Sequence, residues 1–99
     1  MRIISPKKLR NLWEQPGCGD AEQPLRAWLK EVQNATWKTP ADIKRRYPSA
    51  SFLTGNRVCF NIGGKKYRLI AIVLYQRKTL LIRFVNTHEE YDKIDANTV

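Results

Sequence analysis

The chain has 99 residues, of which 42% are hydrophobic and 10% aromatic, and it carries a formal net charge of +9 at neutral pH. This length predicts one domain over residues 1–99 with one hydrophobic core, and the composition excludes a disordered tail. No apolar run approaches the roughly 20 residues that cross a bilayer. Because the first residues also lack the apolar segment of a signal peptide, we expect a cytoplasmic protein that does not bind a membrane.

The composition also bears on metal binding and on disulfides. The chain contains two cysteines, Cys18 and Cys59, and a single histidine, His88. A structural zinc site needs four ligands of these types, and the chain offers only three. We therefore expect two reduced thiols, as in a cytosolic protein, and neither a metal ion nor another cofactor.

The first signals in chain order are those of a strand and a helix. Residues 2–4 predict a short edge strand. Ser5 is a favourable N-cap and Pro6 is favourable at the first helical position, so a helix is expected to start here. The apolar residues that follow have helical spacing until Pro16-Gly17 ends the helix.

Two further helices are expected before residue 50. Asp20 and Gln23 have the spacing of a capping box, and an apolar stripe with helical spacing continues to about Asn34. Thr39-Pro40 again combines an N-cap with a proline and predicts a short helix that stops before Pro48. The first half of the chain is therefore expected to be mainly helical.

After residue 51 the period of the apolar residues changes to two, which indicates β-strands. One strand ends at Ile62, Gly63-Gly64 marks a hairpin turn, and two further strands are expected at 66–75 and 80–85. A polar segment with helical character follows. Helices, an antiparallel meander and a short terminal helix predict an α+β fold in which the N-terminal helices pack on one face of the sheet.

The alternation of a pleated strand predicts which side chains share a face of the sheet. With Ile62 paired with Lys65, the face opposite the helices collects Arg57, Cys59, Asn61, Lys66 and Arg68. An even-length turn at 76–79, pairing Tyr75 with Leu80, places Leu80, Ile82 and Phe84 on the apolar face and Arg83 beside Arg68. An odd-length turn would put the charge of Arg83 on the core side, where an unpaired charge is costly.

The positive charge is concentrated between residues 38 and 83, a segment with a single acid, Asp42. Such a segregated field suits a polyanion; a basic surface without any partner is the alternative. Several of these lysine and arginine side chains could attract RNA phosphates non-specifically. The alternative is that they only form a solvated surface. The candidates for RNA binding are Lys44, Arg45, Arg46, Arg57 and Lys65.

A cluster near the end of the chain has the residue types that RNA cleavage without a metal requires. Such cleavage needs a base for the 2′-hydroxyl, an acid for the departing 5′-oxygen, and cations for the charge that grows on the phosphate. His88 suits either proton role, and Arg68 and Arg83 supply hydrogen-bond donors. Each residue also has a structural alternative: a solvated histidine, arginines paired with acids, and Tyr91 in the core of the last helix.

Two segments resemble the HigB-type toxins of bacterial toxin–antitoxin pairs, which belong to the RelE-like group. Residues 61–71 contain the Gly-Gly turn followed by Tyr-Arg-Leu, and residues 82–92 contain Thr-His-x-x-Tyr-Asp. The resemblance covers most of the chain and is strongest from Phe52 to Asp92. It implies a compact RelE-like α+β fold and an mRNA endonuclease that usually works on ribosome-bound messages and arrests translation. It also implies a cognate helix-turn-helix antitoxin of the HigA type.

The resemblance further implies roles for individual residues. By motif position Arg68, Arg83 and Tyr91 match an arginine, an arginine and a tyrosine of the group, and His88 occupies the place of a histidine common in related toxins. We expect Arg68 and Arg83, assisted by Lys66, to bind the scissile phosphate. His88 then transfers a proton as acid or base, and Tyr91 orients the nucleotide by stacking. Two other functions remain open: a non-catalytic RNA- or ribosome-binding protein, and an inactive homologue that only binds the antitoxin.

Overall fold

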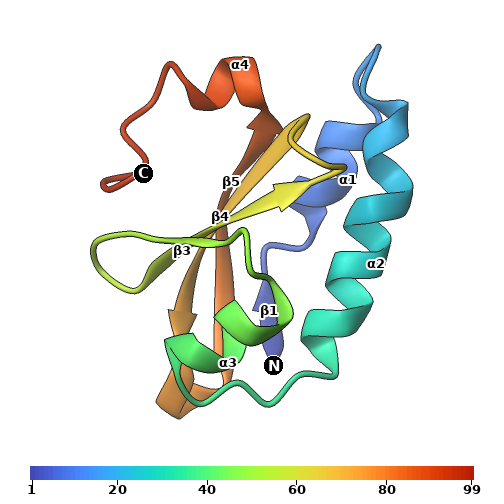
Figure 1. Cartoon of the computed structure of the whole chain (residues 1–99). Helices are drawn as coiled ribbons and strands as arrows, with labels where there is room; N and C mark the ends of the chain where they lie inside the picture. The colour runs from blue at the N-terminus through green and yellow to red at the C-terminus, as the bar shows by residue number, and fades with distance from the viewer.

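The first half of the chain forms one strand and three α-helices in the computed structural model, which describes residues 1–99. The strand is β1 (Arg2–Ile4), and the helices are α1 (Lys7–Trp13), α2 (Glu22–Gln33) and α3 (Pro40–Arg46). The helix α2 buries the predicted apolar stripe, including Leu25, Trp28 and Val32. The helices α1 and α2 lie side by side on one side of the sheet (Figure 1).

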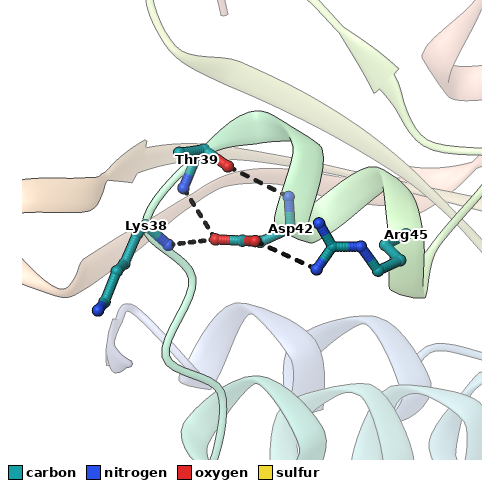
Figure 2. A network of polar contacts seen from close by, with 4 residues as sticks. All are labelled: Lys38, Thr39, Asp42 and Arg45. Carbon is teal, nitrogen blue, oxygen red and sulfur yellow. Dashed lines mark hydrogen bonds and ion pairs between the residues drawn. The ribbon is translucent and has the colours of Figure 1, made fainter.

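The start of α3 follows the sequence closely. Thr39 is the N-cap, and its hydroxyl accepts a hydrogen bond from the backbone N–H of Asp42 at 3.4 Å. The Asp42 carboxylate in turn accepts from the backbone N–H groups of Lys38 (2.9 Å) and Thr39 (3.1 Å). Figure 2 shows this capping box together with the Arg45 guanidinium, 3.5 Å from the same carboxylate. These bonds satisfy backbone donors that the first turn of a helix leaves unpaired.

The other two predicted helix starts were wrong in detail. Ser5 has a positive φ of 68° and makes no capping hydrogen bond, and Pro6 precedes α1 instead of beginning it. Asp20 lies in a short 3₁₀ helix, η1 (Gly19–Ala21), and α2 begins at Glu22 without a side-chain cap. The Asp20 carboxylate instead binds two groups at the start of a strand, which the sequence pattern around it does not reveal.

The sheet has five strands in the order β1-β5-β4-β3-β2. The strands β2 (Ser51–Phe52), β3 (Arg57–Ile62), β4 (Tyr67–Leu74) and β5 (Thr79–Thr87) form the predicted antiparallel meander, and β1 adds to its edge in parallel with β5. A 3₁₀ turn, η2 (Tyr75–Arg77), connects β4 to β5, and a short helix, α4 (His88–Tyr91), follows β5. The expected α+β fold is therefore confirmed.

The strand register preserves the predicted faces, although the pairs differ. Ile62 pairs with Tyr67, not with Lys65, so the hairpin turn spans residues 63–66. Leu74 pairs with Thr79, so the next turn spans residues 75–78 and has the expected even length. Each of these differences moves a pairing by two residues, and a shift of two leaves every side chain on the same face.

The predicted face of Phe84 is wrong, because β5 contains a β-bulge. Ala71 pairs with Ile82 but Ile70 pairs with Phe84, so Arg83 is an extra residue in β5. The extra residue moves Phe84 from the expected apolar face to the opposite face, and Val85 packs against the core. A bulge of this kind re-aims the side chains that follow it.

The hydrophobic core lies between the helices and one face of the sheet. One cluster contains 19 buried residues, and aromatic contacts join its helical and sheet halves. Phe60 of β3 lies 5.4 Å from the Trp28 ring and 6.2 Å from the Trp37 ring, measured between centroids. Two buried residues, Cys59 and Ile70, lie outside this cluster on the other face. No helix in the structure has the length and apolar character needed to cross a membrane.

Candidate active site

Arg68 lies near the start of β4, the middle strand of the sheet, on the face away from α1 and α2. Its register partners are Asn61 on β3 and Asn86 on β5. The half-buried guanidinium lies over the Tyr91 ring, 5.1 Å from its centroid, and no carboxylate binds it. Its Nε is buried and has no hydrogen-bond partner. An unpaired buried donor costs about 1–3 kcal/mol, and because Nε has almost no accessible surface, a ligand oxygen reaches it only if neighbouring atoms move.

Tyr91 comes from α4 and lies against the same face of the sheet. Its ring is 6.3 Å from the Phe84 ring and 6.3 Å from the His88 ring, centroid to centroid. Burial is the main cause that raises the pKa of Tyr91, and the neighbouring Cys59 thiol adds to it. The phenol therefore stays protonated at neutral pH, and the ring supports Arg68 from one side.

His88 is the first residue of α4 and is fixed by its backbone. The Thr87 hydroxyl caps the helix by accepting from the Glu90 N–H at 3.2 Å. The His88 N–H donates to the Lys66 carbonyl at 2.9 Å, which ties α4 to the turn before β4. The imidazole is 44% exposed, and its Nδ1 lies 3.1 Å from an Asp92 carboxylate oxygen. Its Nε2 has no partner in the protein and is available to a ligand.

Arg83 is the extra residue of the β5 bulge. Ile82 before it is buried in the core, and Phe84 after it pairs with Ile70 on the opposite face. Arg83 is exposed and has no acidic partner. The register places Arg83 beside the pair of Phe84 and Ile70, and Ile70 is two residues, roughly 7 Å of strand, from Arg68.

The structure does not add Lys66 and Arg57 to this cluster. The Lys66 ammonium lies 2.5 Å from an Asp20 carboxylate oxygen, and the Tyr67 hydroxyl donates to the same carboxylate. Lys66 contacts the cluster only through its backbone carbonyl, which accepts a hydrogen bond from the His88 N–H in α4. The Arg57 guanidinium donates to the backbone carbonyls of Val99 (2.9 Å) and Thr54 (3.2 Å).

The basic run of α3 lies far from the cluster, because α3 and α4 are at opposite ends of the molecule (Figure 1). Lys44 donates to the Ala50 carbonyl at 2.9 Å, and Arg45 pairs with Asp42. Arg46 pairs with Glu31 and lies over the Tyr47 ring. Lys65 is exposed in the hairpin turn and has no partner. The α3 side chains therefore lie away from Arg68 and Tyr91, whereas Lys65 is adjacent in sequence to Lys66, whose carbonyl accepts from the His88 N–H.

Sequence reasoning missed several residues of this region. Asp92 belongs to the Thr-His-x-x-Tyr-Asp motif but was given no role, although its position four residues after His88 on a helix is a readable signal. The chain after α4 turns back (Figure 1) and contacts the loop between β2 and β3, where the Asn97 side chain accepts from the Thr54 N–H and hydroxyl, both at 3.0 Å. The face expected to be open is therefore partly covered. No group of three or more His, Cys, Asp or Glu side chains is placed to hold a metal ion.

Comparisons with known proteins show which family the chain resembles. Residues 21–94 match the family model described as HigB_toxin, RelE-like toxic component of a toxin–antitoxin system. The chain is 32% identical over 99 residues to the mRNA interferase toxin HigB of Escherichia coli K12, covering 97% of this chain and 92% of that protein. The mRNA interferase HigB of Shigella flexneri gives the same values. The mRNA interferase HigB of Escherichia coli O6:H1 is 24% identical over 72 residues, covering 71% of this chain and 70% of that protein.

Proposed function

The chain belongs to the HigB family of RelE-like toxins, and we infer from this membership that it is the toxin of a toxin–antitoxin pair and cleaves mRNA. We propose further that it cuts messages on the ribosome, in the bacterial cytoplasm, by a route that needs no metal ion. The partner that restrains it is a helix-turn-helix antitoxin of the HigA type. Translation stops because the message is destroyed while it is being read.

One observation carries the mechanistic part of this proposal. The Arg68 guanidinium lies over the Tyr91 ring without a carboxylate partner and with its Nε unpaired. An arginine without a carboxylate partner can bind a phosphate through two donors. The imidazole of His88 comes from the N-terminus of α4, and we propose that exposed Arg83, at the β5 bulge, supplies the second cation.

The proposed reaction uses these residues. The 2′-oxygen loses its proton to a base and attacks phosphorus, the P–O5′ bond breaks, and the departing 5′-oxygen takes up a proton. The products are a 2′,3′-cyclic phosphate and a 5′-hydroxyl. Arg68 and Arg83 stabilise the charge that develops on the phosphate oxygens, which is usually the largest catalytic contribution. His88 transfers one of the two protons.

The roles of Tyr91 and Lys66 change from the sequence hypothesis. One side of the Tyr91 ring is occupied by Arg68, so we propose that Tyr91 positions this arginine and does not stack on the base from that side. The Lys66 ammonium is bound to Asp20, so we assign it no step in the reaction. Its carbonyl positions His88 through the backbone.

Alanine substitution of the two arginines tests the proposal. We expect Arg68→Ala and Arg83→Ala each to reduce cleavage by about 100-fold or more, as removal of a transition-state donor does. Arg77→Ala is the matched control, because Arg77 is exposed in the turn at the other end of β4 and has no ion pair. Growth after induction and primer extension on an induced message measure the effect, and circular dichroism checks the fold. Wild-type cleavage by both arginine variants would remove them from the mechanism.

The same primer-extension experiment separates cleavage from simple binding. Discrete new 5′ ends on the message mean cleavage, whereas blocked translation with intact messages means a non-catalytic RNA- or ribosome-binding protein. A normal growth rate during overexpression would mean an inactive homologue that only binds the antitoxin. New ends that accept a phosphate from polynucleotide kinase without prior phosphatase treatment support the 5′-hydroxyl product. Ends that carry a 5′-phosphate contradict 2′-hydroxyl attack.

A further inference from the structure

We propose that Asp92 is a positioning residue that keeps the proton of neutral His88 on Nδ1, so that Nε2 is the atom that removes the 2′-hydroxyl proton. The inference rests on the proposed nuclease function and assigns His88 the role of base within it. It gives a role to Asp92, which the Thr-His-x-x-Tyr-Asp motif contains without assigning one.

The geometry of α4 brings the two side chains together. The Asp92 N–H donates to the His88 carbonyl at 3.0 Å, which closes one helical turn. Residues four apart share a helix face, and the Asp92 Oδ2 lies 3.1 Å from the His88 Nδ1. An ionised carboxylate can only accept a hydrogen bond, so the hydrogen between these atoms belongs to Nδ1. Neutral His88 then has its free electron pair on Nε2.

Hydrogen bonds also fix the position of the His88 backbone, from which the ring extends. Its N–H donates to the Lys66 carbonyl at 2.9 Å, and the Thr87 hydroxyl caps the helix that follows. A histidine whose one nitrogen is oriented by a carboxylate presents the other nitrogen in a defined direction. The ring is 44% exposed, so Nε2 is open to a substrate that lies along this face of the sheet.

No other charged group competes with Asp92 for the ring. Arg68 of β4 lies over Tyr91, and the Lys66 ammonium is bound to Asp20. Within α4, Glu90 pairs with Lys93 at 3.2 Å, and Glu89 is exposed without a partner. Among the carboxylates of this region, Asp92 is therefore the one that decides which nitrogen carries the proton.

The proposal fixes the direction of the first proton transfer. The proton of the 2′-hydroxyl moves to Nε2 as the new O2′–P bond forms. The resulting imidazolium is stabilised by the Asp92 carboxylate, which stays ionised, as a buried aspartate does for the histidine of serine proteases. The 5′-oxygen takes its proton from solvent water when the P–O5′ bond breaks. The partial exposure of Asp92, 61%, makes the expected effect smaller than that of a buried carboxylate.

The single histidine of the chain allows a direct test that does not depend on activity. Two-bond ¹H–¹⁵N correlation spectra of the whole protein at pH 8, above the ordinary titration range of imidazole, report which nitrogen is protonated. We expect the Nδ1–H form in the wild type and in Glu89→Gln, which removes a neighbouring carboxylate without a contact to His88. We expect Asp92→Ala to shift toward the Nε2–H form that a free imidazole favours. The Nε2–H form in the wild type, or no change in Asp92→Ala, would overturn the proposal.

The second test measures kcat and KM for cleavage of a ribosome-bound message. We expect Asp92→Ala to lower kcat by about 10–100-fold with little change in KM, since outer groups that orient a histidine have effects of this size. Asp92→Asn keeps an acceptor for Nδ1–H and should recover part of the activity, and Glu89→Gln should stay within about 2-fold of the wild type. Full activity of Asp92→Ala contradicts the positioning role. If the wild type itself does not cleave RNA, the nuclease function fails, and the spectra still decide the contact.

Discussion

The two faces of the sheet differ in what they bury. The face under α1, α2 and α3 belongs to a cluster of 19 buried residues, whereas the opposite face buries only Cys59 and Ile70, beneath Tyr91 and its neighbours. The first face holds the fold together through apolar burial. The second face carries half-buried Arg68, a charge that is costly to place in a core and useful toward a polyanion.

The difference between the faces indicates how a small chain can hold an arginine without an acidic partner on its second face. Arg68 is in β4, which is paired on both sides and packed against the core through Leu69 and Ala71. Side chains on a central strand are held more rigidly than side chains on loops. The stability of the first face therefore supports the geometry of the second, and substitutions on each face should have separable effects.

The largest expected effect is on stability and comes from Phe60, on the helix-covered face. Phe60→Ala should lower the free energy of unfolding by about 3–5 kcal/mol, because the ring is 1% exposed and contacts Trp28, Trp37 and Tyr47. This is a large part of the 5–15 kcal/mol typical of a domain. Urea unfolding followed by tryptophan fluorescence measures it.

The control for Phe60 is Phe52→Ala, which removes the same side chain from the edge strand β2. Phe52 is 40% exposed, so we expect a change of at most about 1 kcal/mol. Similar unfolding midpoints for the two variants would mean that the helix-covered face does not dominate stability. The cleavage rate per folded molecule should remain near that of the wild type for Phe52→Ala.

Several features of the fold follow directly from local sequence patterns. Helical spacing identified α2, Thr39-Pro40 identified the capping box of α3, and the period of two identified the strands. The faces of β3 and β4 were predicted although their register was displaced, because a displacement of two residues leaves the alternation unchanged. The cost of burying the charge of Arg83 correctly favoured an even-length turn.

The remaining features depend on contacts between distant residues. The bulge that inserts Arg83 adds one residue to β5, and no local pattern marks it, so Phe84 was assigned to the wrong face. Asp20 has the spacing of a helix cap, but it is better satisfied by Lys66 and Tyr67, which are 46 and 47 residues away in sequence. A pattern of nearby residues predicts local hydrogen bonds and does not reveal a stronger distant partner.

A smaller expected effect is on activity and comes from Tyr91, on the second face. Tyr91→Leu removes the ring under Arg68 and should lower cleavage by about 10-fold, since a cation–π contact contributes about 0.5–2 kcal/mol. Tyr91→Phe keeps the ring and should stay within about 3-fold of the wild type, which makes it the matched control. Single-turnover cleavage of a ribosome-bound message measures both. An equal loss in the two variants would assign the effect to the hydroxyl and not to the ring.

The smallest expected effect concerns Asp20, which connects the helical layer to the start of β4. Hydrogen bonds from Lys66 and then from Tyr67 lower the pKa of Asp20 below its ordinary value. A carboxyl whose pKa is lower in the folded protein stabilises the fold above its unfolded pKa, and this contribution is lost as the pH falls through its folded pKa. The wild type should therefore unfold at a slightly higher temperature than Asp20→Asn at pH 6, with the difference shrinking below about pH 4.

Glu14→Gln is the control for Asp20→Asn, because Glu14 is an exposed carboxylate whose side chain makes no ion pair or hydrogen bond. Thermal unfolding of the three proteins between pH 3 and pH 7 gives the comparison. A difference between wild type and Asp20→Asn that grows toward low pH would have the wrong sign and would contradict the lowered pKa.

The same pair of variants tests whether Asp20 influences His88. Because the Lys66 carbonyl also accepts from the His88 N–H, Asp20→Asn should broaden the His88 resonances at pH 6, while Glu14→Gln leaves them unchanged. That result would mean that contacts on the helix-covered face restrict the motion of the His88 ring through the first residues of β4. Equal His88 spectra in both variants would mean that the two faces are independent.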